Sequence, residues 1–499
     1  MPPSWFPPFP TTVRRPAGVI LLAAALLTAG PTAAAESPAS STNTVGVLDR
    51  LAVENTPGDD DGPTGTTTWL RTPTERIQIV PEAVRGIPSG STLSLRLVHD
   101  DLLHDTLLHD KDARVPASPH RVTSVTVMSR ASSTSPAPSA ANRHVVTIVL
   151  ALPKGVDADG VTATSLSRTV SGGVSSYWSS ASEGRIRFTV SRTVGWTRLT
   201  ASCNDVWGIW DQARAKSAFL TGPRRHLLVY VPPSAGCPAG LATVGGSADA
   251  GGMTLVGGHT TSLIAHELGH NLGLGHSDAL TCTGTSDARF HAGEDGGKFG
   301  GTCRHVLYGD WYDVMGISWE QLGSLSTAHA YRLGLLGPGS VLTAGAPARV
   351  TLRPVSGRTG LRSLRVVDPA GATYVVEYRP ASGLDGWIGT DADWKKHTAG
   401  VLIRRVDPED PAQTLLLDAT PGPAPEDDHD VTLVRGQVLK TASGRVSLVA
   451  ESITSAGATV VVAVDDVWPG TSYPSRGRLV SGRQITIGEA LTGLGAGSS

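Results

Sequence analysis

Three histidines and one glutamate fall within the eleven residues HELGHNLGLGH, residues 266 to 276. His266 and His270 are four residues apart, so on a helix their imidazole rings project from the same face. Two imidazoles at this spacing can bind one divalent ion, and zinc favours neutral nitrogen ligands. Glu267, beside the first histidine, would reach water at the metal without ligating it, which is the position of a general base.

The rest of the stretch supplies a third ligand. Thr260, Thr261 and Ser262 are good N-cap residues, so a helix is expected to begin there. Gly273 can adopt a positive φ that ends the helix and turns the chain back, which returns His276 to the ion. Three histidines leave one position open for water, as a catalytic zinc site requires and a closed structural site does not. The pattern predicts a hydrolase with one catalytic Zn²⁺.

The metal chemistry alone leaves the substrate open. Hydrolysis of a peptide bond and hydrolysis of a non-peptide amide need the same metal and the same base. A third reading is a binding or adhesion protein that keeps zinc only for structure. Glu267 argues against that reading, because a structural zinc site needs no general base.

The N-terminus has the pattern of an export signal, assigned to residues 1–35. Two arginines precede the apolar run AGVILLAAALLTA at 17–29, and three alanines at 33–35 suit signal peptidase. The alternative is a membrane anchor, but the run is short for a permanent span. We therefore expect a secreted, extracellular protein with no membrane association after cleavage. The net charge of −2 gives no electrostatic case for a nucleic-acid partner.

The chain has four cysteines, and export places them in an oxidising compartment. An even count indicates two disulfides, and the order in the sequence favours Cys203–Cys237 and Cys282–Cys303, although two other connectivities stay open. No pair has the two-residue spacing of a zinc knuckle.

Composition divides the rest of the chain. Residues 36–141 begin acidic and end in the linker-like ASSTSPAPSAAN, and they suit a propeptide or a small N-terminal domain. Residues 142–339 alternate strand and helix patterns and are expected to form the catalytic domain. Residues 340–466 carry seven short strand patterns between Gly, Pro and Asp turns, which suggests an accessory β-sandwich. Residues 467–499 read as a flexible tail.

The motif HELGHNLGLGH resembles the zinc signature of the metzincin metallopeptidases. That family has a methionine turn below the metal, and YGDWYDVMGIS at 308–318 supplies Met315. The sequence around both motifs, together with YWSSASEGRIRFTV before them, most resembles that of the gametolysin-type branch. Similar sequences also occur in secreted bacterial proteins. The resemblance covers about residues 143–465. It implies an α+β catalytic fold with a mixed sheet, a zinc helix and a lower subdomain holding the Met-turn, followed by the all-β sandwich-like domain.

The resemblance also implies a function, that of a zinc endopeptidase acting on proteins or peptides, with extracellular matrix or cell-wall protein as candidate targets. Two departures qualify the branch. Gametolysin has Gln at the first motif position, where this chain has His266. Some metzincins have a metal-facing Tyr two residues after the Met, where this chain has Ile317, and Tyr312 precedes the Met instead.

Family analogy places the substrate along a strand near 240–247, and an apolar specificity pocket at 316–325, with Trp319 and Leu322. Many metzincin proenzymes block zinc with a cysteine, but 36–141 contains none. We consider Asp105 or Asp110, in a run of spaced His-Asp pairs, as a substitute blocker, although a solvated segment is the alternative. The acidic run PEDDHD at 425–430 has calcium-type ligands and could hold Ca²⁺, although a solvated acidic turn is the alternative and nothing else in the sequence supports the ion. The oligomeric state is not readable from the sequence.

Overall fold

The computed structural model describes residues 41–54, 65–99, 120–131, 143–292, 298–317, 319–422 and 429–469. The expected export signal and almost all of the expected tail lie outside these ranges. No helix within them is long and apolar enough to cross a membrane. Most of the regular structure is β-strand, and the helices are few and short.

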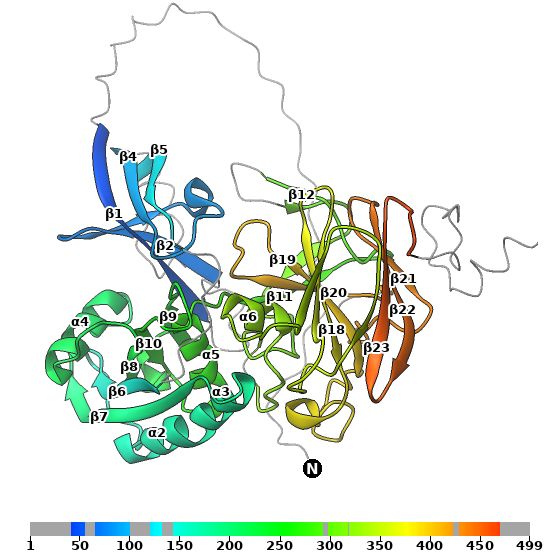
Figure 1. Cartoon of the computed structure of the whole chain (residues 1–499). Helices are drawn as coiled ribbons and strands as arrows, with labels where there is room; N and C mark the ends of the chain where they lie inside the picture. The colour runs from blue at the N-terminus through cyan, green and yellow to red at the C-terminus, as the bar shows by residue number, and fades with distance from the viewer. Residues whose placement is uncertain are drawn as a thin grey trace, which may run out of the picture. The chain divides into compact units, whose positions relative to one another are not determined.

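The first sheet has ten strands and contains both the N-terminal segment and the sheet behind the histidine motif (Figure 1). Its order is β3-β2-β1-β9-β10-β8-β6-β7, with β4 pairing β1 and β5. The strands are β1 (Ser41–Glu54), β2 (Gly65–Arg71), β3 (Arg76–Ile79), β4 (Thr92–His99), β5 (His120–Ser129), β6 (Arg143–Leu152), β7 (Arg187–Arg198), β8 (Arg225–Tyr230), β9 (Gly240–Thr243) and β10 (Gly252–Val256).

Helices cover both faces of the β6–β8–β10 portion. The helix α4 (Val206–Ser217) packs on one face through Ile209, Trp210 and Ala213. The other face is covered by α2 (Ala163–Thr169), a π-helical turn, α3 (Ser175–Ala181) and α5 (Thr261–Asn271), which share one apolar core with the sheet. The continuous apolar runs of β6 and β8 suit strands buried on both faces. This core fixes α5, which carries the first two histidines, behind the sheet.

The second half of the chain forms two sheets that share one apolar core. The seven-stranded sheet has the order β14-β11-β20-β19-β18-β17-β15, and the four-stranded sheet has the order β16-β23-β22-β21. The strands are β11 (Ser277–Thr281), β14 (Arg304–Val306), β15 (Val341–Ala344), β16 (Ala348–Leu352), β17 (Ser363–Val367), β18 (Thr373–Arg379), β19 (Gly400–Val406), β20 (Thr414–Leu417), β21 (Val438–Lys440), β22 (Val446–Thr454) and β23 (Gly457–Val464), with the short pair β12 (Phe290–His291) and β13 (Lys298–Phe299) and the helix α6 (Thr327–Arg332) beside them.

Two features of these sheets differ from the accessory β-sandwich expected from residues 340–466. The strand β11, directly after His276, joins the larger sheet by pairing parallel to β20, and β15 pairs parallel to β17. The run DVTLVRG at 430–436 makes only isolated bridges, at Leu433 and Arg435. The third histidine is therefore held at the start of a strand that belongs to the C-terminal sheet.

Candidate metal centre

The helix α5 begins and ends as the residue pattern predicts. The Thr260 hydroxyl accepts a hydrogen bond from the Leu263 backbone N–H at 3.3 Å and caps the first turn. Gly273 has a φ of 100°, and its N–H bonds to the His270 carbonyl at 2.8 Å. This left-handed residue reverses the chain, which then carries His276 back over the helix.

The three histidines converge in the interior. The centroid of the His270 ring lies 4.7 Å from that of the His266 ring and 4.8 Å from that of the His276 ring. All three side chains are buried. Burial lowers the pKa of His276 well below its ordinary value, and the neighbouring imidazoles add to the effect. A neutral imidazole offers a lone pair, which is the form that binds a metal.

Backbone carbonyls fix the orientation of the first two rings. His266 Nδ1 donates to the Val314 carbonyl and His270 Nδ1 donates to the Leu274 carbonyl, each at 2.8 Å. A carbonyl can only accept, so each Nδ1 carries the proton and each neutral ring presents an Nε2 lone pair. The two Nε2 atoms are 2.9 Å apart. Two lone pairs at that distance repel unless a cation lies between them, so the arrangement fits a metal ion.

A fourth side chain joins the histidines, and the sequence did not point to it. Glu54, the last residue of β1, places Oε1 2.5 Å from His266 Nε2 and 3.6 Å from His270 Nε2. The ligand atoms of Glu54 and the three histidines all lie within 4.8 Å of one another. This buried group can hold a metal ion. No local pattern marks Glu54, because only the pairing of β1 with β9 brings it here.

Glu267 is buried beside the same group. Neither of its carboxylate oxygens receives a hydrogen bond within the described residues. Burial raises the pKa of Glu267 well above its usual value, and the nearby Glu54 carboxylate adds to this. By contrast, burial disfavours the ionised form of Glu54, but positive charge on His266 and His270 in their protonated forms outweighs burial and holds the pKa of Glu54 well below its usual range. Two carboxylates so close together are both ionised only with strong positive charge nearby, which a divalent ion supplies.

The turn around Met315 lies under α5, as a methionine turn would. A Cβ added to Gly269 would collide with the Met315 sulfur, so this glycine lets the helix rest directly on the methionine. The Met315 carbonyl accepts from the Ser277 N–H at 2.8 Å, and its own N–H donates to Asp313 Oδ1 at 2.9 Å. The Val314 carbonyl of the same turn accepts from His266. The turn therefore orients His266 directly, and it also holds the start of the strand that follows His276.

Buried charges from the C-terminal sheet brace this turn. Arg404 on β19 donates to Asp310 at 2.5 Å and to Glu377 on β18 at 2.7 Å. Asp310 in turn accepts from the Ser277 hydroxyl at 2.8 Å. The C-terminal sheet therefore forms part of the support of the metal centre, through a network with no water-exposed member.

Tyr308 is a second site residue without a sequence signal. Its ring lies 4.5 Å from the His276 ring, and its hydroxyl donates to the Val53 carbonyl at 2.7 Å. Its φ of 56° is left-handed, and its N–H is held by Asp278 at 2.7 Å. Tyr312, the tyrosine considered from the sequence, instead donates to the Thr398 carbonyl and packs near Trp387.

The cysteines pair in sequence order, Cys203 with Cys237 and Cys282 with Cys303. Trp319, expected in a specificity pocket, packs against Trp311 and Trp387, and Leu322 packs against the core that contains α5. Asp105, Asp110 and most of the acidic run 425–430 lie outside the described residues.

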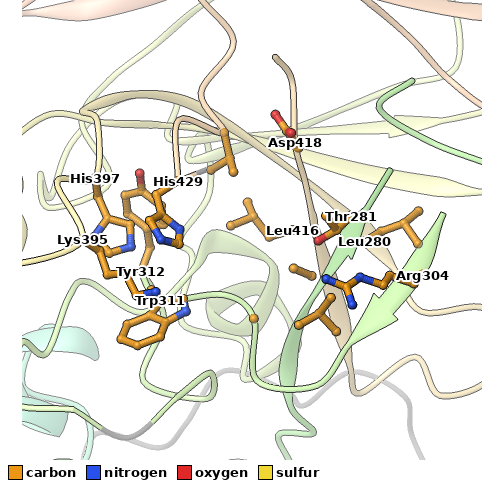
Figure 2. A pocket seen from close by; sticks show the side chains of 14 residues that line it. Leu280, Thr281, Arg304, Trp311, Tyr312, Lys395, His397, Leu416, Asp418 and His429 are labelled. Carbon is orange, nitrogen blue, oxygen red and sulfur yellow. The ribbon is translucent and has the colours of Figure 1, made fainter. Parts of the chain in front are cut away.

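A separate hollow of about 160 Å³ lies beside β11 and the loop that leads to Met315. Figure 2 shows Trp311, Tyr312, Lys395, His397 and His429 together on one side of it, and Leu280, Thr281 and Arg304 on the other. Its lining contains none of the three histidines or Glu54.

Three comparisons bear on the chain. No known protein-family profile matches it. A stretch of 115 residues is 34% identical to human disintegrin and metalloproteinase domain-containing protein 9, and covers 21% of this chain and 14% of that relative's length. Among solved structures, metalloproteinase-II from Bacteroides fragilis aligns with a TM-score of 0.24 at 13% identity, over 54% of this chain and 75% of that one. A chaperone–substrate complex aligns with a TM-score of 0.19 at 12% identity, over 48% of this chain and 38% of that one.

Proposed function

We propose that this protein is a secreted zinc-dependent endopeptidase of the metzincin type, related to the gametolysin-type branch. The observation that carries the proposal is the pair of Nε2 lone pairs of His266 and His270, 2.9 Å apart, beside a buried Glu267 that receives no hydrogen bond from the described residues. A structural zinc site would need the imidazoles but not this carboxylate. The partial identity to a metalloproteinase supports the same reaction class.

The residues suit hydrolysis of an amide. His266, His270 and His276 would hold Zn²⁺, which supplies Lewis-acid chemistry and makes water nucleophilic near neutral pH. Glu267 takes a proton from the attacking water at a carboxylate oxygen and passes it to the leaving amine. The site lies next to β9, so an extended peptide could pair with this strand through main-chain hydrogen bonds once β1 has left its edge. That arrangement favours peptide substrates over isolated amides.

The substrate class we propose is protein or peptide in the extracellular space, including matrix or cell-wall protein. Two disulfides suit an oxidising compartment, and the N-terminal sequence has the pattern of an export signal. Calcium has no support among the described side chains, since the one cluster of metal-type ligands found there contains three histidines.

The test incubates the zinc-loaded protein with a mixed set of peptides and identifies the products by mass spectrometry. The assay is run on the untreated protein and on protein that has been treated briefly with immobilised trypsin. We expect cuts at internal bonds, loss of cutting with a chelator and recovery with added Zn²⁺. Glu267→Gln, treated identically, should keep one zinc per chain and lose about 10²-fold to 10⁴-fold in rate, because the base is gone. Bound zinc without any peptide cleavage would favour a non-peptide amide hydrolase or a zinc-stabilised binding protein.

A further inference from the structure

The N-terminal strand β1 occupies the edge of β9 that a substrate would need. The two strands pair antiparallel, with Leu51 opposite Thr243 and Glu54 opposite Gly240. Figure 1 shows β1 running down to β9. The other edge of β9 pairs with β10, so β1 takes the remaining one. A peptide adding to β9 would have to displace β1, because each strand edge accepts one partner.

Side chains along β1 alternate between the two faces of the sheet, and Glu54 lies on the face where the histidines are. Leu51 and Val53 enter the apolar core that contains Leu241 and Leu255. Successive side chains of a strand point to opposite faces, so Ala52 and Glu54 face the other way. Glu54 thereby reaches the histidines from the same strand that covers the substrate edge, and its carboxylate is buried there.

The carboxylate completes the ligand set. Three histidines leave a fourth position of a tetrahedral zinc site open, and a carboxylate oxygen is a good zinc ligand. Glu54 Oε1 is within 4 Å of both Nε2 atoms and receives no hydrogen bond from the described residues. With Glu54 in place, the site has the four ligands of a closed centre.

The N-terminal segment is held by apolar and by polar contacts. Leu51, Val53 and Trp69 enter the core of the sheet behind α5, and the Trp69 ring lies 6.0 Å from the Trp207 ring. Tyr308 bonds the Val53 carbonyl, directly before Glu54. Arg85 pairs with Glu409 at 2.7 Å, and Arg76 pairs with Asp211 at 3.4 Å, in partly exposed positions. Exposed ion pairs of this kind contribute little free energy. The segment is thus held at the metal centre by the ladder between β1 and β9, by these apolar side chains and by a few ion pairs, and all of them must part before the substrate edge is free.

We infer that Glu54 is a fourth ligand of the metal centre and that β1 is a built-in occupant of the substrate edge, so that residues 41–131 keep the enzyme latent until they are displaced or cut away. This inference rests on the proposed function for the identity of the metal and of the substrate. In this inference the residue that blocks the metal is Glu54 on β1, and not a cysteine or one of the aspartates considered from the sequence.

The test uses the uncut, zinc-loaded chain and the small zinc-binding probe acetohydroxamate, whose binding is measured by calorimetry. The apparent affinity of a probe falls with the fraction of molecules whose site is open. We therefore expect Glu54→Gln to bind acetohydroxamate at least about tenfold more tightly than the wild type. The matched control is Asp49→Asn. Asp49 is an acid on the same strand, and its carboxylate pairs with Arg71 instead of the histidines. This variant should bind the probe as the wild type does.

Two further measurements keep the test decisive. Glu54→Asp retains the charge on a shorter side chain, and it should fall between wild type and Glu54→Gln. Hydrogen exchange of the β9 amides should rise in Glu54→Gln if the carboxylate anchors the strand, with melting temperature as the check on folding.

The outcomes separate the two proposals. Equal probe affinity in the folded wild type and in both Glu54 variants overturns the inference and leaves peptide hydrolysis standing. Tighter binding in the variants, without peptide cleavage by any form of the chain, keeps Glu54 as a ligand and refutes the peptidase.

Discussion

The Tyr308 hydroxyl donates a 2.7 Å hydrogen bond to the Val53 carbonyl, and the ring of the same tyrosine lies 4.5 Å from the His276 ring. Val53 immediately precedes Glu54, so this carbonyl is the last main-chain acceptor before the carboxylate that meets the histidines. A peptide that replaces β1 on β9 would present a carbonyl at the same place. In the proposed peptidase, Tyr308 would then position the substrate.

Tyr308→Phe should therefore weaken substrate binding in the processed enzyme. One neutral hydrogen bond contributes about 1 kcal/mol, so we expect up to about a tenfold rise in KM with a smaller change in kcat. Zinc content should stay the same. Tyr378→Phe is the matched control, because its hydroxyl bonds the Thr454 carbonyl within the C-terminal sheets. Identical KM and kcat for Tyr308→Phe and wild type would exclude the role.

Gly240 determines how closely β9 approaches the base. A Cβ at this position would collide with Glu267 Oε1, whereas a Cβ at Gly257 would have no neighbour nearer than 3.7 Å. Gly240→Ala should displace the Glu267 carboxylate and lower kcat by about 100-fold, since a shift of about 1 Å can cost that much. Zinc content should not change, because the histidines are held elsewhere. Gly257→Ala should retain full activity, and full activity in Gly240→Ala would disprove the contact.

Arg404 joins two buried acids, Asp310 and Glu377. Although burial favours the neutral acid, Arg404 and then Arg379 bring the pKa of Glu377 to about 2. Arg404→Met would leave two buried carboxylates without this partner, which costs about 3–5 kcal/mol of unfolding free energy. Guanidinium denaturation followed by tryptophan fluorescence measures the loss. Arg445→Met, in an exposed pair with Asp465, should leave the curve unchanged. A small effect at Arg404 would show that this network contributes little to the stability of the fold.

The convergence of the three histidines could be predicted from sequence because one helix and one turn position them. His266 and His270 need only helical spacing, and His276 needs only the reversal at Gly273, which are local properties of the chain. Glu54 and Tyr308 reach the same centre through a strand pairing and through a loop with a left-handed residue. Neither has a periodicity or a motif, so no local pattern could have identified them.

The same distinction applies to the fold. The apolar runs at β6, β8 and β23 and the helix α4 follow from their own residues. The pairing of β11 with β20 does not, because β11 is a short strand whose partner lies far along the chain. This pairing attaches the strand after His276 to the C-terminal sheet, which the composition had suggested was an accessory unit.

Two histidines outside the metal centre form a buried chain behind α5. His226 Nδ1 donates to Asn271 Oδ1 at 3.0 Å, and His144 Nδ1 lies 2.9 Å from His226 Nε2. Since the amide oxygen only accepts, His226 carries its proton on Nδ1, and His144 donates to the other nitrogen. Burial lowers the pKa of His226 to about 4 and that of His144 to about 2. Both rings are neutral in the folded protein at neutral pH.

The buried pair of His226 and His144 should make the free energy of unfolding depend on pH within a definite window. The unfolded chain protonates His226 near pH 6.5, whereas the folded chain does so only near pH 4. Between these values the unfolded state binds more protons, so the stability that neutral His226 provides is complete above pH 6.5 and is lost as the pH falls. Unfolding free energies of wild type and His226→Gln, measured from pH 6.5 to 4.5, should converge by about 1.4 kcal/mol per pH unit at the acid end. The metal ligands are common to both proteins, so their titration largely cancels in the difference. Parallel curves would mean that His226 takes up its proton equally in the folded and unfolded states.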